Sequence, residues 1–198
     1  MAANEPDNLK TGNPAPLLAE IERLKAELAR AQRSIAELEA RADVDPLLDI
    51  LNRRGFEREL GRALAYLQRY KGEAALLFID LDGFKAINDR HGHATGDKLL
   101  KAVARGLTGH VRASDVVARL GGDEFGVLLW NLEPAQAFHK ARDLESLIGA
   151  VEIGECETGL RIGASIGVAS LTVGSTPEEV IDAADRAMYA RKAERRSA

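Results

Sequence analysis

The chain has 198 residues, of which 45% are hydrophobic, 29% charged and 5% aromatic, a composition that excludes a fibrous or intrinsically disordered protein. Its length accommodates one full domain and a short appendage, since domains of roughly 100–200 residues are usual. The formal net charge of −4 provides no positive field for phosphate polymers or anionic lipid, so we expect no nucleic-acid partner. The single cysteine, Cys156, excludes an internal disulfide.

The start of the chain shows neither a targeting signal nor regular structure. Residues 1–16 have three prolines, one glycine and no periodic pattern, which indicates a flexible leader. They also lack the apolar stretch of a signal peptide. The longest apolar runs, such as residues 74–79, are far shorter than the roughly 18 residues that span a bilayer. We therefore expect a cytoplasmic protein without membrane contact.

Residues 17–42 carry a heptad pattern. Apolar residues recur at alternating steps of four and three, namely Leu17, Ile21, Leu24, Leu28, Ala31, Ile35, Leu38 and Ala42. Isoleucine at a positions with leucine at d positions favours a parallel two-stranded coiled coil, in which Glu20 could meet Lys25 of the partner chain. We predict a homodimer through residues 17–42; the alternative is one amphipathic helix that lies on its own domain.

Residues 43–198 have the pattern of one mixed domain. Helices are expected at 52–70, 96–108, 134–149 and 177–195, the last opened by a capping box at Thr176–Glu179. Strands are expected at 74–81, 116–120, 125–130 and 161–171. This order predicts an α+β fold with a central, mostly antiparallel sheet flanked by helices.

Two acidic pairs stand at the ends of predicted strands. Asp80 and Asp82 close the first strand, face the same way at period two, and repel each other unless a cation lies between them. Asp123 and Glu124 follow Gly121-Gly122, which predicts a tight hairpin. If the hairpin strands neighbour the first strand, these acids converge into a hard-cation site suited to Mg²⁺ and nucleotide phosphates. Turn capping is the alternative for the first pair alone.

Several further polar residues fit a nucleotide. Lys85 follows the first acidic pair, while Lys192 and Arg196 lie near the end of the last helix, where solvated cations are also favoured. Asn88 and Asp97 form a matched set for guanine, because a carboxylate accepts from N1–H and N2–H₂ and an amide addresses the N7/O6 edge. Without a family resemblance, Asn88 would be interpreted as a turn residue and Asp97 as a helix cap.

Three segments together identify a family. FIDLDGFKAIND at 78–89, Gly92-His93 with Gly96-Asp97, and RLGGDEF at 119–125 closely resemble the GGDEF-domain diguanylate cyclases. The resemblance extends from about Asp45 to Arg196. It implies a fold akin to nucleotide cyclases and polymerase palm domains. It also implies a dimeric enzyme that condenses two GTP into cyclic di-GMP and releases pyrophosphate.

The resemblance also implies a role for each matching residue. Asp80, the Leu81 carbonyl and Asp123 would hold Mg²⁺, or Mn²⁺ in its place. Asp123 would act as the base for the 3′-hydroxyl with Glu124 beside it, while Lys85 would stabilise charge on the phosphates.

The nucleotide contacts follow in the same way. Asn88 and Asp97 would bind guanine, with Asp97 favouring strict GTP use. Gly121 and Gly122 would let the nucleotide approach the backbone. Lys192 and Arg196 would hold the phosphate tail.

A regulatory site is implied as well. Arg112-Ala-Ser-Asp115 resembles the family's inhibitory Arg-x-x-Asp site for the cyclic di-GMP product, and Arg142 is a candidate to complete it. A surface ion pair between Arg112 and Asp115 is the alternative. A non-catalytic cyclic di-GMP receptor or scaffold, which binds at residues 112–115 and uses the coil for partner contact, is the alternative for the whole chain.

The sequence departs from the family pattern near both ends of the domain. Leu48 and Asp49 replace the usual Thr-Gly, and Arg195 and Ser197 stand where Gly and Asn are usual.

Overall fold

The computed structural model describes residues 15–152 and 160–197, with the side chains of 15–17, 31, 33–42 and 195–197 left aside. The chain forms two compact units, residues 1–41 and 42–198. No helix in the described ranges is long and apolar enough to cross a membrane.

The first unit contains helix α1 (Ala15–Ala42). It begins two residues before the predicted helix, while the predicted leader up to residue 14 lies outside the described residues. Leu18, Ile21, Leu24 and Leu28 are 46–59% exposed in the single chain. Arg23 forms ion pairs with acids within the helix. An exposed apolar stripe on a charged helix is what a coiled-coil partner would cover, and the dimer remains a prediction.

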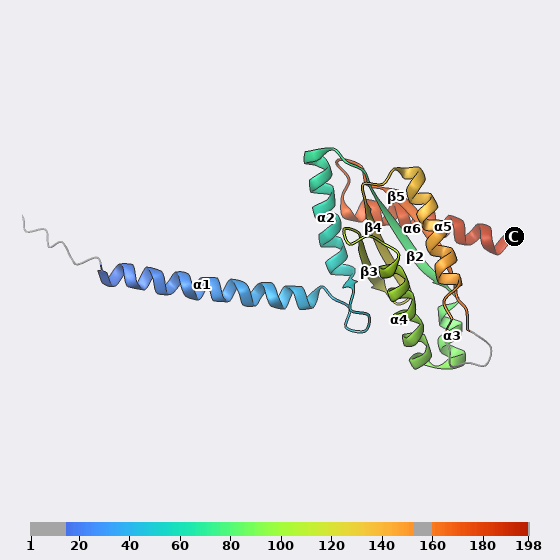
Figure 1. Ribbon diagram of the computed structural model, residues 1–198, viewed down its shortest axis with the longest axis horizontal. Helices are drawn as coiled ribbons and strands as arrows, with labels where there is room; N and C mark the ends of the chain where they lie inside the picture. The colour runs from blue at the N-terminus through green and yellow to red at the C-terminus, as the bar shows by residue number, and fades with distance from the viewer. Residues whose placement is uncertain (1–14, 153–159, 198) are drawn as a thin grey trace, which may run out of the picture. The chain divides into compact units, whose positions relative to one another are not determined.

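The second unit is built on a five-stranded sheet of order β1-β3-β4-β2-β5 (Figure 1). The strands are β1 (Leu51–Asn52), β2 (Ala74–Asp82), β3 (Val116–Gly121), β4 (Glu124–Trp130) and β5 (Gly163–Ser170). Only β1 and β3 pair in parallel, and the other neighbours are antiparallel. The predicted α+β class with a mostly antiparallel sheet is therefore confirmed.

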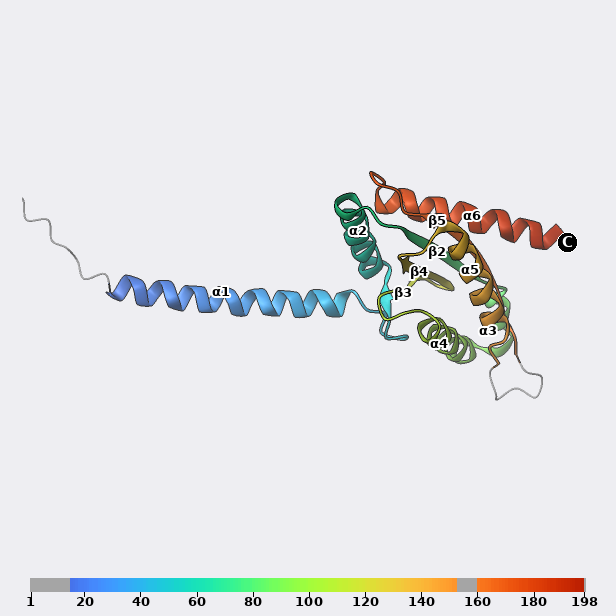
Figure 2. The same ribbon diagram turned by 45° about the horizontal axis from the view of Figure 1, so that its top comes forward.

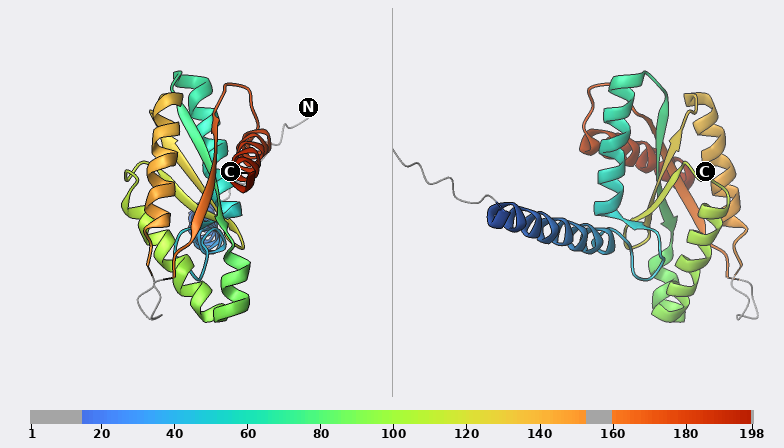
Figure 3. Two further views of the ribbon diagram at one scale, coloured as in Figure 1. Left: turned by 90° about the vertical axis from the view of Figure 1, so that its right-hand side faces the viewer. Right: turned by 60° about the vertical axis from the view of Figure 1, so that its left-hand side comes forward.

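Helices cover both faces of this sheet (Figure 3). Helices α2 (Arg53–Tyr70) and α6 (Pro177–Ser197) pack on one face. Helices α4 (His93–Gly109) and α5 (Pro134–Gly149) pack on the other, with α3 (Phe84–His91) at its edge. The two faces have separate apolar clusters, so each side of the sheet contributes its own core.

Strand β2 lies between β4 and β5 and is buried on both faces, which explains its nearly continuous apolar sequence. Leu77 and Ile79 belong to the cluster under α4 and α5, whereas Leu76 and Phe78 belong to the cluster under α2 and α6. Because side chains alternate along a strand, Asp80 continues the Phe78 face and points toward α6.

Helix α6 runs alongside β5 and β2 (Figure 2) and packs closely on β5 at Gly167. A Cβ atom at Gly167 would lie 2.0 Å from the Ala184 carbonyl oxygen, so only glycine permits this approach. The predicted capping box also forms: the Thr176 N–H donates to the Glu179 carboxylate at 2.9 Å, and the Glu179 N–H donates to Oγ1 of Thr176 at 3.3 Å. The capping box fixes where α6 begins, and the contact at Gly167 fixes how closely this helix, which carries Lys192, packs on the sheet.

The structure differs from the sequence prediction mainly in three elements. The segment after β2, for which no element was predicted, contains α3, and α4 begins at His93, three residues before the expected start at 96. Gly83 and Gly92, with φ of 78° and 82°, bracket α3 and make the segment resemble a loop. Short β1 was also missed, because two residues carry no periodicity.

Candidate functional site

The site is built on the end of β2. Asp80 lies opposite Glu124 of β4 and opposite Ser165 of β5, so it is held between two neighbouring strands. Asp82 lies further along the same face, and its carboxylate accepts a hydrogen bond from the Ser165 hydroxyl at 3.0 Å. The pairing of β2 with β4 and β5 therefore fixes the positions of the Asp80 and Asp82 carboxylates.

The predicted hairpin forms between β3 and β4, and its turn meets the end of β2. Gly122 has φ of 45°, a left-handed conformation that glycine adopts without strain. The Leu81 N–H donates to the backbone carbonyl of Asp123 at 3.2 Å. This bond brings the turn that carries Asp123 against the strand that carries Asp80, as the convergence of the two acidic pairs requires.

Arg119 anchors the turn from within β3. Its Nε and one terminal nitrogen donate to the Gly122 carbonyl at 3.0 and 2.8 Å. The other terminal nitrogen forms an ion pair with Asp45 at 3.2 Å. One guanidinium therefore connects the acidic turn to the segment that opens the domain, a use of its planar fork that lysine could not reproduce.

Lys192 supplies the cation that the strand-end acids require. Its ammonium group donates to Asp80 and lies 3.9 Å from an oxygen of Asp82. The Lys192 and Asp80 side chains are 21% and 15% exposed, so the pair is largely shielded from water. The repulsion expected between Asp80 and Asp82 is thus offset by a residue about 110 positions away in sequence.

The turn carboxyls have raised pKa values. Burial raises the pKa of Asp123, and the nearby Asp80 carboxylate raises it further, while a backbone hydrogen bond and Lys192 oppose the rise. Burial also raises the pKa of Glu124, with Arg53 acting in the opposite direction. Acidic groups with pKa values moved toward neutrality are suited to accept a proton.

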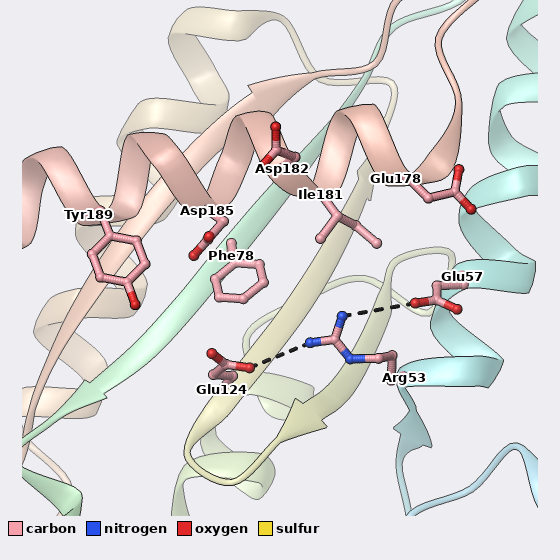
Figure 4. A pocket seen from close by; sticks show the side chains of 9 residues that line it. All are labelled: Arg53, Glu57, Phe78, Glu124, Glu178, Ile181, Asp182, Asp185 and Tyr189. Carbon is pink, nitrogen blue, oxygen red and sulfur yellow. Dashed lines mark ion pairs between the residues drawn. The ribbon is translucent and has the colours of Figure 1, made fainter.

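A cavity of about 300 Å³ opens beside Glu124, between α6 and the start of α2 (Figure 4). Arg53 reaches it from the first turn of α2, forms an ion pair with Glu124 at 3.5 Å and donates to the Leu120 carbonyl at 2.9 Å. Sequence reasoning missed Arg53, as well as Asp185 and Tyr189 on α6. The only available signal for Arg53 was its place directly after Asn52, the N-cap of α2.

A family model described as "Diguanylate cyclase, GGDEF domain" matches residues 42–198. The chain belongs to this family. The chain is 39% identical over 184 residues to the diguanylate cyclase TpbB of Pseudomonas aeruginosa, an alignment that covers 89% of this chain and 41% of TpbB.

Two further similar proteins also contain this domain. The bifunctional diguanylate cyclase/cyclic di-GMP phosphodiesterase MucR of Pseudomonas aeruginosa is 43% identical over 168 residues, which cover 84% of this chain and 24% of MucR. The crystal structure of the coiled coil and GGDEF domain of DgcB from Caulobacter crescentus, in complex with c-di-GMP, superposes with a TM-score of 0.75 at 26% identity. It covers 90% of this chain and 95% of that one. This chain spans less than half the length of the two curated relatives.

The candidate guanine residues of this GGDEF domain lie where α3 meets α4. A Cβ atom on Gly96 would lie 2.0 Å from Oδ1 of Asn88, so the amide rests directly on the glycine that precedes Asp97. Oδ1 of Asn88 is buried without a hydrogen-bond partner among the described residues, while Asp97 is exposed. An unpartnered buried acceptor is costly, so the Asn88 amide is a candidate to bind a polar group of a ligand.

The candidate phosphate residues come from α3 and α6. Lys85 is exposed in the first turn of α3, whose N-cap Gly83 provides no side-chain cap. The first N–H groups of a helix lack partners inside the helix and favour anions. Lys192 is held at Asp80. Arg196 lies on α6, and its side chain is outside the described residues.

The GGDEF domain offers oxygen donors for a divalent ion without a complete cage. No group of three or more His, Cys, Asp or Glu side chains is arranged as a metal site within the described ranges. Asp80 and Asp123 instead lie near each other, because the bond from the Leu81 N–H joins the turn to the strand end, and Mg²⁺ is commonly held by one or two carboxylates plus substrate phosphates. The ammonium of Lys192 at Asp80 demonstrates that this position attracts a cation. The residues therefore fit an ion that arrives with a nucleotide.

The candidate product loop borders a second cavity, of about 280 Å³, on the α5 side of the domain. Asp115 accepts from the backbone N–H of Arg112 at 2.9 Å and of Trp130 at 3.1 Å, so the alternative of an Arg112–Asp115 surface ion pair is not formed among the described side chains. The Arg112 side chain is exposed at the cavity. Lys140, not Arg142, lines it from α5, and Arg142 is exposed elsewhere on that helix.

Proposed function

We propose that this chain is a cytoplasmic diguanylate cyclase that joins two molecules of GTP into cyclic di-GMP and releases two pyrophosphates. The observation that supports it most directly is the bond between the Leu81 N–H and the Asp123 carbonyl. It places the acidic turn and the acidic strand end together beside Lys192. The names of the relatives, TpbB and MucR, support the same activity.

Guanine would bind between α3 and α4. Asn88 presents an unpartnered carbonyl oxygen, and Asp97 presents a carboxylate. The Asp97 carboxylate would accept from N1–H and N2–H₂ of guanine, whereas adenine has an acceptor at N1, and the amide group of Asn88 would donate to the N7/O6 edge. The site would therefore prefer GTP to ATP.

The triphosphate would extend from this pocket toward the end of β2. The first turn of α3 and Lys85 would neutralise part of its charge, and Lys192 and Arg196 would hold the tail. The exposed, side-chain-free edge formed by Gly121 and Gly122 would let the sugar and phosphates pass close to the hairpin.

Asp80, the Leu81 carbonyl and Asp123 would hold Mg²⁺, or Mn²⁺, which when bound neutralises phosphate charge and lowers the pKa of the attacking hydroxyl. Asp123 would accept the 3′-hydroxyl proton, a role favoured by its raised pKa. The 3′-oxygen then forms a bond to the α-phosphorus of the other GTP, and the bond from that phosphorus to pyrophosphate breaks. Glu124 would add negative charge beside Asp123.

The reaction requires two subunits, because each would hold one of the two nucleotides. Residues 17–42 would bring them together as a parallel coiled coil, which would cover the exposed stripe at Leu18, Ile21, Leu24 and Leu28. Holding both half-sites on one coil raises their effective concentration. The resemblance to the DgcB coiled coil and GGDEF domain, which covers 90% of this chain, supports this arrangement.

Product would inhibit through the loop at Arg112 and Asp115. The exposed guanidinium and the adjacent cavity provide an anion-binding, planar contact for a cyclic dinucleotide. Arg142 would join the site only after it moves toward Lys140.

The test incubates the protein with GTP and Mg²⁺ and resolves the nucleotides by chromatography. The wild type should form cyclic di-GMP, and Asp123→Asn should lose at least roughly 100-fold of that rate while keeping its circular dichroism spectrum. Asp143→Asn, at an exposed position on α5, is the matched control. Binding of cyclic di-GMP without any turnover of GTP would instead favour the receptor alternative.

The coil has its own test. Leu28 is 59% exposed in the single chain, so Leu28→Asp should leave the domain folded and weaken only the dimer. We expect specific activity to fall at low protein concentration and to recover as concentration rises. Equal activity and a monomeric mass in both proteins would contradict the proposed dimer.

A further inference from the structure

A buried carboxylate on α5 reaches the last strand of the sheet. In the five-stranded sheet that the described residues form, β5 is the last strand and pairs with β2. Helices α5 and α6 lie on opposite faces of the sheet at this strand (Figure 3). The outward N–H groups of such a strand need acceptors other than a neighbouring strand. The Ile166 N–H of β5 donates to Oε1 of Glu145, on α5, at 3.3 Å.

The other carboxylate oxygen of Glu145 binds the last helix. Oε2 accepts from a terminal nitrogen of Arg191, on α6, at 3.1 Å. The Glu145 and Arg191 side chains are 9% and 31% exposed, whereas the pair of Arg186 with Asp182 on the same helix is 69% and 60% exposed. A shielded pair is screened less by solvent than a surface pair. Glu145 therefore ties α5 to α6 past the edge of β5, although the two helices cover different faces.

This ion pair lies directly beside the candidate phosphate lysine. Arg191 immediately precedes Lys192 in the sequence. The core anchors α6 upstream of both, because Met188 is buried where the helix meets Gly167 of β5. Residues 189–194 are exposed or half-buried, so apolar burial contributes little to holding these turns. The polar contacts of Arg191 and Lys192 therefore set the position of this helix end.

The two contacts have different fates in the proposed reaction. Asp80 would hold the divalent ion and Lys192 the phosphate tail, so the Lys192–Asp80 pair must open when nucleotide and metal bind. The pair of Arg191 with Glu145 includes neither of these groups, and it can persist through the exchange. Without it, the helix end that carries the Lys192 ammonium gains conformational freedom. Nucleotide binding must then remove that freedom, which weakens the phosphate contact.

We propose that Glu145 is a positioning residue for GTP, which acts through Arg191 to hold Lys192 at the phosphate tail. The inference rests on the proposed function, because it deepens the role given there to Lys192. Glu145 itself touches neither nucleotide nor metal. The competing role for Glu145 is to satisfy the Ile166 N–H alone, in which case Arg191 has no part in nucleotide binding.

The test measures the calorimetric affinity of the full chain, with Mg²⁺, for a GTP analogue that has a methylene group between its α- and β-phosphates and cannot release pyrophosphate. Glu145→Gln keeps an oxygen acceptor for the Ile166 N–H and loses the ion pair. It should weaken binding of the analogue by roughly threefold or more. Arg191→Met should cause a similar loss, whereas Arg191→Lys, which keeps the charge, should retain most of the affinity.

A second background shows whether Glu145 acts through Lys192. Lys192→Gln lacks the ammonium group, so adding Glu145→Gln to it should cause no further loss of affinity. Independent losses would add, whereas losses that pass through one residue do not. Arg186→Met, which breaks the exposed ion pair with Asp182 on the same helix, is the matched control and should bind as the wild type does.

Two more measurements separate positioning from a general loss of structure. In the nucleotide-free protein, the backbone amides of residues 191–197 should exchange hydrogen faster in Glu145→Gln than in the wild type, while those of residues 180–188 stay unchanged. In turnover, Glu145→Gln should raise KM for GTP more than it lowers kcat, because the chemistry of the acidic turn is untouched.

Several results would overturn the proposal. Wild-type affinity in Glu145→Gln and Arg191→Met would leave Glu145 as a cap of the strand edge only. Additive losses of Glu145→Gln and Lys192→Gln, unchanged hydrogen exchange, or a wild type that does not bind the analogue would also exclude the positioning role. If the wild type binds the analogue and makes no cyclic di-GMP from GTP and Mg²⁺, the proposed activity fails, and the binding measurements still decide the role of Glu145.

Discussion

Lys192 should compete with the divalent ion for Asp80. Its ammonium group lies where a cation would bind and contacts Asp80 in the nucleotide-free structure. A hydrogen bond to a charged, partly buried group contributes about 1.5–3 kcal/mol, and solvent around these 21% and 15% exposed side chains reduces this to about 1–2 kcal/mol. Replacing Lys192 by glutamine removes that competition. Since 1.4 kcal/mol is tenfold in affinity, Mn²⁺ should bind the nucleotide-free variant about 5–30-fold more tightly.

The measurement is a Mn²⁺ titration of the nucleotide-free protein, followed by the electron paramagnetic resonance signal of free Mn²⁺. Lys101→Gln, at an exposed lysine on α4, should leave the affinity unchanged and controls for net charge. With GTP present, Lys192→Gln should instead bind Mn²⁺ more weakly than the wild type, because the variant has lost a phosphate contact. Mn²⁺ affinity in Lys192→Gln equal to or weaker than wild type would refute the competition.

Three other changes test the site. Burial raises the pKa of Asp123, so its ionised form destabilises the folded state, and this cost grows as the pH rises through that pKa. Metal-free Asp123→Asn should therefore have a higher melting temperature than wild type at pH 7.5. The difference in melting temperature should shrink toward pH 4. Arg119→Ala frees the Gly122 carbonyl and should lower kcat by roughly tenfold or more with a smaller change in KM for GTP, a split that steady-state kinetics measures. Gly96→Ala places a methyl 2.0 Å from Oδ1 of Asn88 and should raise KM for GTP more than it lowers kcat; an unchanged KM would exclude Asn88 from guanine binding.

Much of the fold could be predicted because local pattern and tertiary environment agree. Strand β2 is apolar on both faces because both faces are covered, and α5 (Pro134–Gly149) matches its predicted bounds. The hairpin was evident from its glycine pair. In each case the residues that set the structure are neighbours in the sequence.

The prediction failed where the local pattern is weak or where distant residues decide the structure. Helix α3 has only Phe84 buried, so it shows little helical periodicity, and its packing against α4 gives it support. The ion pairs of Lys192 with Asp80 and of Arg53 with Glu124 join residues that no spacing rule connects.

The departure at Leu48-Asp49 is accommodated locally. Asp49 has φ of 55°, the left-handed region where the family's usual glycine is favoured. Aspartate tolerates this region better than most residues, and the Asp49 N–H donates to the Asp45 carbonyl at 3.0 Å. The Leu48-Asp49 sequence thus keeps a tight turn, which only the backbone angles reveal.

The guanidinium of Arg119 links two parts of the domain that are distant in sequence. One partner is Asp45, near the start of the folded unit, and the other is the Gly122 carbonyl, next to Asp123 and Glu124 in the hairpin. Because β1 also pairs with β3 and Arg53 donates to the Leu120 carbonyl, the segment that opens the domain is joined to the hairpin at several points. A regulator that displaces this opening segment would therefore act on the hairpin and its acidic turn together.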